Sequence, residues 1–149
     1  MRIAALNWAE VASHLVDLAI AFALALPIGW NREHEARSAG LRTFPLVATA
    51  SCGFVLVAIR VLGEGSTGRA RIIEGLITGI GFIGGGAIVR GAGETSGTAT
   101  AASLWVTGAV GAAVGYGLYD IGAILAAVTL ATLRLMAPLK RPARESESR

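Results

Sequence analysis

One apolar stretch, from Gly79 to Trp105, has five glycines among its first eight residues. In water each glycine that replaces alanine destabilises a helix by roughly 1 kcal/mol, so this composition disfavours a soluble helix. In a bilayer the helix keeps its backbone hydrogen bonds, and glycines four residues apart let a neighbouring helix approach closely. The sequence therefore predicts a membrane helix that packs through its glycines and favours a homodimer or larger homo-oligomer. The glycines predicted to pack are Gly75, Gly79, Gly81, Gly84 and Gly85.

The composition of the whole chain also favours a membrane protein. Of its 149 residues, 54% are hydrophobic and 15% are charged, and the mean hydropathy is +0.63. A soluble domain is typically about 45–50% apolar and about 25% charged. The net charge is +3, but the basic residues lie at the ends of apolar runs and form no patch with interleaved aromatics. This pattern argues against nucleic acid as a partner.

Five apolar segments are each long enough to cross a hydrocarbon core of about 30 Å, which takes about 20 helical residues. They cover residues 11–30, 43–62, 69–89, 98–116 and 119–137. The predicted fold is therefore an all-α integral membrane bundle of five transmembrane helices in residues 1–137, with a short polar tail at residues 138–149. Membrane lipid is the expected surrounding, and no cofactor is predicted.

Lysine and arginine are divided unequally between the two ends of this bundle. Nine lie on the side that carries residues 31–42 and the tail, and four lie on the opposite side. Because positive residues concentrate on the cytoplasmic side, we predict a multi-pass protein of the bacterial inner membrane with its N-terminus outside and its C-terminus in the cytoplasm. The loop 31–42, the end of the third helix and the start of the fourth then meet at the cytoplasmic face.

The start of the fourth predicted helix is rich in hydroxyl side chains. Thr95, Ser96, Thr98 and Thr100 are predicted to cap its free backbone N–H groups. The partial positive charge of this helix end also suits an anion or a loop carboxylate such as Glu33. The sequence leaves two interpretations open, a plain helix cap beside solvated charges and an anion-binding site.

Asp17 and Glu74 lie inside predicted membrane helices, where a charge costs about 2.5–3.5 kcal/mol on insertion scales. Glu74 follows Arg71 by three residues, so the two can pair on one helix face, with Thr78 one turn deeper. Asp17 follows His14 by the same interval. Each pair is either a structural feature near the outer membrane surface or a cation or proton site.

The sequence predicts neither an enzyme nor a metal site. It lacks the motifs G-x-S-x-G, H-E-x-x-H and G-x-x-x-x-G-K-[ST]. Magnesium binding would need one or two carboxylates with several retained waters. Glu33, Glu35, Asp17 and Glu74 are available, but no spacing shows that they converge, so no metal ligand is assigned.

Three segments of the chain together resemble the membrane domain of the MgtC/SapB family. They read GWNREHEARSAGLRT, RIIEGLITGIGFIGGGAIVR and SGTATAASLWVTGAVG, where the family has G-x-x-R-E, A-G-L-R-T-H, G-I-G-F-L-G-A-G and G-L-T-T-A-A-S-L-W in the same order. The resemblance covers residues 28–117 and implies a five-span inner-membrane bundle with a cytoplasmic C-terminus. The residues that match the family motifs are Arg32, Glu33, Gly40, Leu41, Arg42 and Thr43 in the first loop, and Gly97, Thr98, Thr100, Ser103 and Trp105 at the fourth helix.

The chain departs from the family pattern at three positions and at its end. Phe44 stands where the family often has His or Asn, Gly68 where many members have Asp, and Glu74 where Gln is common. The tail ends at Arg149, so we expect a short, membrane-only member without the cytoplasmic domain of longer members.

The resemblance implies an inner-membrane accessory or regulatory protein that acts through membrane-protein partners. Longer members are associated with growth under magnesium limitation, with virulence of intracellular pathogens and with inhibition of the F-type ATP synthase. The alternative, which the frequent family label of magnesium transport protein suggests, is a small oligomeric Mg²⁺ or H⁺ transporter or channel with Asp17 or Glu74 in its path.

Overall fold

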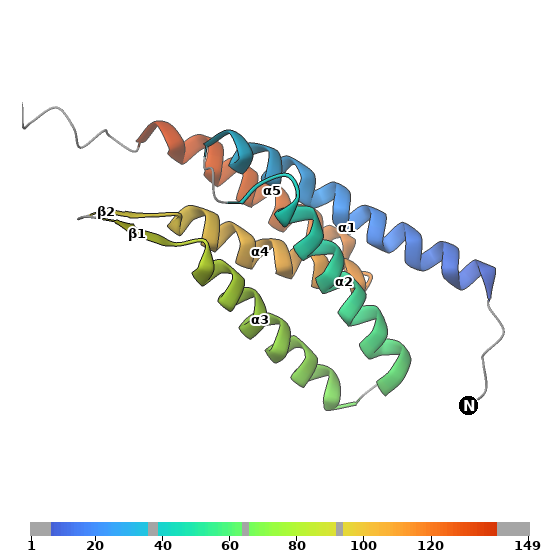
Figure 1. The fold of residues 1–149 in the computed structure, drawn as a ribbon. Coiled ribbons are helices and arrows are strands. Elements are labelled where there is room, and N and C mark those ends of the chain that lie inside the picture. Colours follow the sequence, from blue (N-terminus) through green and yellow to red (C-terminus); the bar gives the residue numbers. More distant parts are fainter. Residues whose placement is uncertain (1–6, 36–38, 64–65, 92–93, 140–149) are drawn as a thin grey trace, which may run out of the picture.

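The computed structural model describes residues 7–35, 39–63, 66–91 and 94–139. Figure 1 shows an elongated bundle of helices with a short β-ribbon at one end. The elements are α1 (Trp8–Glu35), α2 (Thr43–Leu62), α3 (Gly68–Gly86), β1 (Val89–Gly91), β2 (Glu94–Ser96), α4 (Thr98–Gly115), α5 (Tyr119–Met136) and the 3₁₀ turn η1 (Ala137–Leu139).

The five helices confirm the predicted helical bundle. Each occupies one of the predicted apolar segments, and α1 extends past its segment at both ends. By length and composition, α1, α2, α4 and α5 can cross a membrane. The helix α3 is the fifth and is less apolar, because Arg69, Arg71 and Glu74 lie in its first two turns. Between α3 and α4, the strands β1 and β2 form an antiparallel ribbon, in which Val89 pairs with Ser96.

The helix α4 forms the centre of the bundle, because it contacts each of the other four helices. Three of its glycines make these approaches close. A Cβ atom at Gly108 would overlap the side chain of Ile80 on α3, and one at Gly111 would overlap the backbone carbonyl of Ala48 on α2. At Gly115 a Cβ would lie 2.8 Å from Cβ of Val55, also on α2. Small residues thus bring backbones together, as expected between membrane helices.

The glycines of α3 behave differently from those of α4. Gly84 does contact α4, since a Cβ atom there would lie 3.2 Å from the carbonyl oxygen of Ala101. A Cβ at Gly75, Gly79, Gly81 or Gly85 would meet no atom within 4 Å in the described part of the chain. Of these five glycines, Gly84 contacts another helix of the chain, and the packing role of the set stays a prediction.

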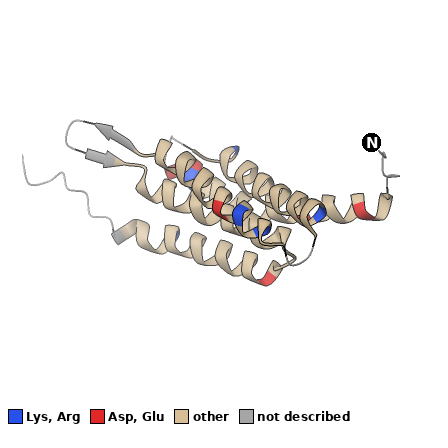
Figure 2. Cartoon of the chain, turned by 90° about the horizontal axis from the view of Figure 1, so that it is seen from below, with Lys and Arg blue, Asp and Glu red and all other residues tan. Residues whose placement is uncertain are grey.

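The outer surface of the bundle is apolar, and its interior is built largely from small residues. Ala21 and Ala25 of α1 are fully buried and share one cluster with Ala48 and Cys52 of α2. Large side chains such as Phe54, Phe82, Trp105 and Ile124 are exposed. Figure 2 shows that most of the ribbon carries neither basic nor acidic residues. A surface of this kind is unusual in water and ordinary in contact with lipid.

One ion pair fastens the end of the bundle where α1 begins. Arg60 near the end of α2 donates a hydrogen bond to the carboxylate of Glu10 in the first turn of α1, at 2.6 Å. Both side chains are partly exposed, so the pair adds modestly to stability. It links residues 50 positions apart that the sequence did not indicate as partners.

Candidate functional site

Three segments that carry the family motifs lie at the same end of the bundle. Figure 1 shows the end of α1, the start of α2, the β-ribbon and the start of α4 at this end, opposite the start of α1. We call this end of the molecule the motif end. The topology that the apolar segments predicted places these parts together, because each helix reverses the direction of the chain.

The loop between α1 and α2 is held to α1 by Glu33. The backbone N–H of Leu41 donates a hydrogen bond to Oε2 of Glu33, at 3.0 Å. A Cβ atom at Gly40 would overlap the same carboxylate, so only glycine allows the loop to approach Glu33 this closely. Phe44 N–H then donates to the carbonyl of Gly40, at 3.2 Å, as α2 begins. Glu33 therefore positions the family-motif loop. Its carboxylate accepts the N–H of Leu41 and is not used at the start of α4.

A buried cation lies beside this loop. Arg32 is 7% exposed, and its Nη1 donates to Oε2 of the more exposed Glu35, at 2.9 Å. The Nε atom of Arg32 is buried and has no hydrogen-bond partner among the described residues. Arg42 and Thr43, the other polar motif residues of the loop, begin α2, where Arg42 is exposed.

Among the described side chains, no hydroxyl group caps the start of α4, contrary to the sequence prediction. Gly97 occupies the N-cap position with φ +88°, and none of the described side chains makes a capping hydrogen bond there. A Cβ at Gly97 would overlap the carbonyl of Ala87, so the close return of the chain from α3 requires glycine there. Thr98 is exposed, and Thr100 is fully buried with no partner for its hydroxyl among the described residues. The side chain of Thr95 lies outside the described ones.

Of the remaining motif residues of α4, Ser103 forms hydrogen bonds within the helix and Trp105 lies on the surface of the bundle. The hydroxyl of Ser103 donates to the carbonyl oxygen of Ala99, at 2.7 Å, and Thr107 donates to that of Ser103, at 2.8 Å. These bonds satisfy polar groups inside the bundle without any partner helix. Trp105 is 51% exposed and belongs to the apolar outer surface.

Asp17 has a partner that the sequence did not indicate. Tyr119 at the start of α5 donates a hydrogen bond from its hydroxyl to Oδ1 of Asp17, at 2.6 Å, and Asp17 is 8% exposed. The expected partner, His14, is exposed and makes no hydrogen bond among the described residues. The two bonded residues are 102 positions apart, so no local spacing could reveal the pair.

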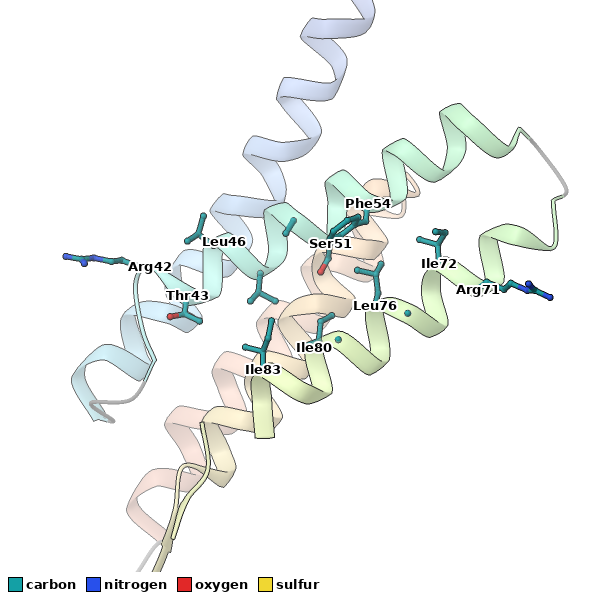
Figure 3. Close-up of a pocket in the computed structure, with 14 residues that line it drawn as sticks. Arg42, Thr43, Leu46, Ser51, Phe54, Arg71, Ile72, Leu76, Ile80 and Ile83 are labelled. Atoms are coloured by element: carbon teal, nitrogen blue, oxygen red, sulfur yellow. The ribbon is translucent and has the colours of Figure 1, made fainter. Parts of the chain in front are cut away.

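The ion pair expected between Arg71 and Glu74 does not form. Both residues are exposed, and the ion pairs among the described residues join Arg32 to Glu35 and Arg60 to Glu10. Figure 3 shows the Arg71 side chain extending away from the bundle, where water or lipid headgroups can solvate it. Thr78 donates to the backbone carbonyl of Glu74, at 2.9 Å, and not to its carboxylate.

A groove of about 720 Å³ opens between α2 and α3. Figure 3 shows apolar side chains of both helices, among them Leu46, Phe54 and Leu76, along its length. Gly75 and Gly79 leave the α3 side of the groove open. Neither Asp17 nor Glu74 lines this groove. In the part of the chain that is described, no three His, Cys, Asp or Glu side chains are grouped so that they could hold a metal ion.

The model of the MgtC family matches residues 18–142 of the chain. The chain belongs to the MgtC family. It is 39% identical to SrpB of Synechococcus elongatus, with 83% of this chain and 75% of SrpB covered. It is 37% identical to MgtC of Brucella abortus, with 89% of this chain and 55% of that protein covered. No solved structure matches the chain.

A third relative of this MgtC-family chain carries a name that refers to magnesium. YhiD of Escherichia coli K12, described as a candidate magnesium transporter, is 32% identical, with 83% of this chain and 60% of YhiD covered. The chain thus spans little more than half the length of the Brucella relative. Family membership and four apolar helices long enough to cross a membrane identify a multi-pass membrane protein.

Proposed function

We propose that this MgtC-family chain is an accessory or regulatory protein of the bacterial inner membrane that acts during magnesium-limited growth by binding another membrane protein. The names of the relatives MgtC and YhiD support the link to magnesium. The F-type ATP synthase is the partner that family analogy suggests. In this proposal the motif end faces the cytoplasm, because nine of the thirteen lysines and arginines are assigned to that side.

The observation that carries this proposal is the construction of the motif end. Glu33 and Gly40 hold the loop against α1, and they leave His34, Glu35 and Arg42 exposed beside it. Exposed polar and charged side chains at a helix end and on the loop beside it are suited to recognise a partner. The family motif is thus used to shape a surface at one end of the bundle.

Complementation of growth at low magnesium tests the proposal. In a strain that lacks the gene, we expect Glu33→Ala to abolish complementation although the protein accumulates in the membrane at the normal level. The loop loses the acceptor for Leu41 N–H, which contributes about 0.5–1.5 kcal/mol. Glu33→Gln keeps an acceptor oxygen and should restore growth in part. Asp120→Ala, at an exposed position of α5 away from the motif end, is the matched control.

Binding is measured on the same variants by co-purification with the F-type ATP synthase. The wild-type chain and Asp120→Ala should retain the synthase, and Glu33→Ala should lose it. Full complementation by Glu33→Ala would contradict a role of the motif end. Loss of growth with unchanged synthase binding would exclude the synthase as the relevant partner.

A second candidate function, ion transport, is favoured by the buried carboxylate of Asp17. An ionisable residue inside a membrane helix is by default a functional candidate. Flux of Mg²⁺ or H⁺ through proteoliposomes tests this candidate. Flux that Asp17→Asn or Glu74→Gln abolishes would favour a transporter, and absence of flux from the purified chain would leave the regulatory role.

A further inference from the structure

We propose that the groove between α2 and α3 binds one anionic phospholipid, with its phosphate at Arg42 and Thr43 and its acyl chains along the groove. The site shares Arg42 with the partner surface at the motif end, and from there it extends along the two helices.

The body of the groove is suited to hydrocarbon. Its α2 wall includes Leu46, Ala50 and Phe54, and its α3 wall includes Leu76 and Ile80. The space exists because Gly75 and Gly79 have no side chains to fill it. In a bilayer an apolar groove with a volume of about 720 Å³ does not stay empty, because lipid chains are the surrounding solvent.

The ends of the groove are basic. Arg42 lies at one mouth and Arg71 at the other, and Figure 3 shows both side chains extending outward from the apolar middle. Neither is in an ion pair with a carboxylate among the described residues. A guanidinium group binds phosphate through paired hydrogen bonds, and the hydroxyl of Thr43 beside Arg42 is a further donor. A basic position between membrane helices is the kind of site that takes an acidic headgroup.

The length of the groove fits the lipid of one leaflet. From Thr43 to Phe54 the α2 wall rises by about 16 Å at 1.5 Å per residue. One half of the hydrocarbon core is about 15 Å deep. A lipid whose phosphate binds Arg42 therefore has chains that end near Phe54, in the middle of the bilayer.

Charge disfavours a second copy of the chain as the occupant. Two copies that met parallel to each other through this groove would bring their Arg42 residues to the same level and their Arg71 residues to the same level. Like charges across an interface oppose association. A phospholipid instead brings the opposite charge to the mouth that it occupies.

Native mass spectrometry of the full chain tests the proposal, after reconstitution with phosphatidylglycerol and phosphatidylcholine in equal amounts. We expect one phosphatidylglycerol per chain to survive detergent removal, with about fivefold preference over phosphatidylcholine, the ratio that roughly 1 kcal/mol per arginine implies. Arg42→Gln should remove this preference. Arg134→Gln, which changes an exposed arginine in the last turn of α5, should leave it unchanged.

Filling the groove provides the second arm of the test. Gly79→Leu should abolish lipid retention, whereas Gly85→Leu, on the same helix and also in open space but outside the groove, should not. Ala50→Phe fills the groove from α2 and serves if Gly79→Leu does not fold.

Three outcomes would overturn the proposal. They are equal retention of the two lipids by the wild-type chain, lipid retention by both groove-filling variants, and a wild-type dimer without lipid that Gly79→Leu converts to a monomer. The last outcome would identify a second copy of the chain in the groove.

Discussion

Asp17 places a carboxyl group inside the apolar helix α1, and the hydroxyl of one tyrosine donates a hydrogen bond to it. The hydroxyl of Tyr119 lies 2.6 Å from Oδ1, and Asp17 is 8% exposed. Leaving a buried acceptor without its donor costs about 1–3 kcal/mol, and more for a charged group. The contact also joins α1 to the start of α5, so it fastens two helices that are far apart in the chain.

We therefore expect Tyr119→Phe to lower the free energy of unfolding in detergent by about 1–3 kcal/mol, because the buried carboxyl group of Asp17 loses its hydrogen-bond donor. Thermal unfolding followed by circular dichroism measures the effect. Tyr116→Phe is the matched control, since the Tyr116 hydroxyl makes no hydrogen bond among the described residues. Equal stability of the two variants would show that the Asp17 contact contributes nothing.

At the scale of elements, three glycines of α4 lie in contacts between helices, whereas most glycines of α3 face open space. Gly111 and Gly115 let α4 approach the backbone of α2, and Gly108 makes room for the Ile80 side chain of α3. Gly81 and Gly85 on α3 face open space, outside the groove between α2 and α3. The same residue type thus builds the interior of the bundle in one helix and leaves a bare outer face in the other.

Replacement of Gly111 by alanine should destabilise the bundle by about 1–3 kcal/mol, because the added methyl group overlaps the carbonyl of Ala48. Gly85→Ala adds the same group in open space and should be neutral or slightly stabilising, since alanine favours helix. The difference between the two melting temperatures in detergent tests the assignment. A Gly111→Ala variant as stable as Gly85→Ala would count against the central position of α4.

The bare face of α3 supports our proposal of a homodimer. Gly81 and Gly85 lie four residues apart on one face, which suits close contact with a second copy of α3. We expect Gly81→Leu to shift the detergent-solubilised chain from dimer to monomer, measured by light scattering. Ile124→Leu, at an exposed position of α5, should leave the mass unchanged. A wild-type chain that is already monomeric would end this proposal.

At the scale of the whole molecule, the four helices packed around α4 place three distant motif segments at one end of the described structure. The fold sets which segments share an end, whereas orientation in the membrane depends on the distribution of charge. The two can be tested separately with single cysteines, because the native Cys52 is buried.

We expect Glu35→Cys and Thr98→Cys, both at the motif end, to react with an impermeant maleimide only in inverted vesicles. Thr67→Cys, an exposed position between α2 and α3, should react only in intact cells. Opposite results for positions 35 and 98 would refute the fold. Reversal of all three would refute the proposed orientation alone.

Much of the fold follows from local properties of the sequence. The predicted segments 43–62 and 98–116 agree within a residue with α2 and α4, because apolar run length and flanking charge are local and the bilayer requires them. The location of the motif end follows from the same segments, since successive membrane helices alternate in direction. Less of the candidate site could be predicted, because its hydrogen bonds depend on contacts between helices.

By itself the sequence determined a helical membrane bundle, the number of its helices and the end at which its motifs meet. Only the tertiary structure decided that α4 is central, that Tyr119 donates a hydrogen bond to Asp17, and that Gly97 occupies the N-cap position of α4. The physical reason is that helix formation depends on neighbours within a few residues. The partners of polar groups and of glycines depend on which helix faces pack against each other. Such a partner can lie 102 positions away along the chain, as Tyr119 does from Asp17.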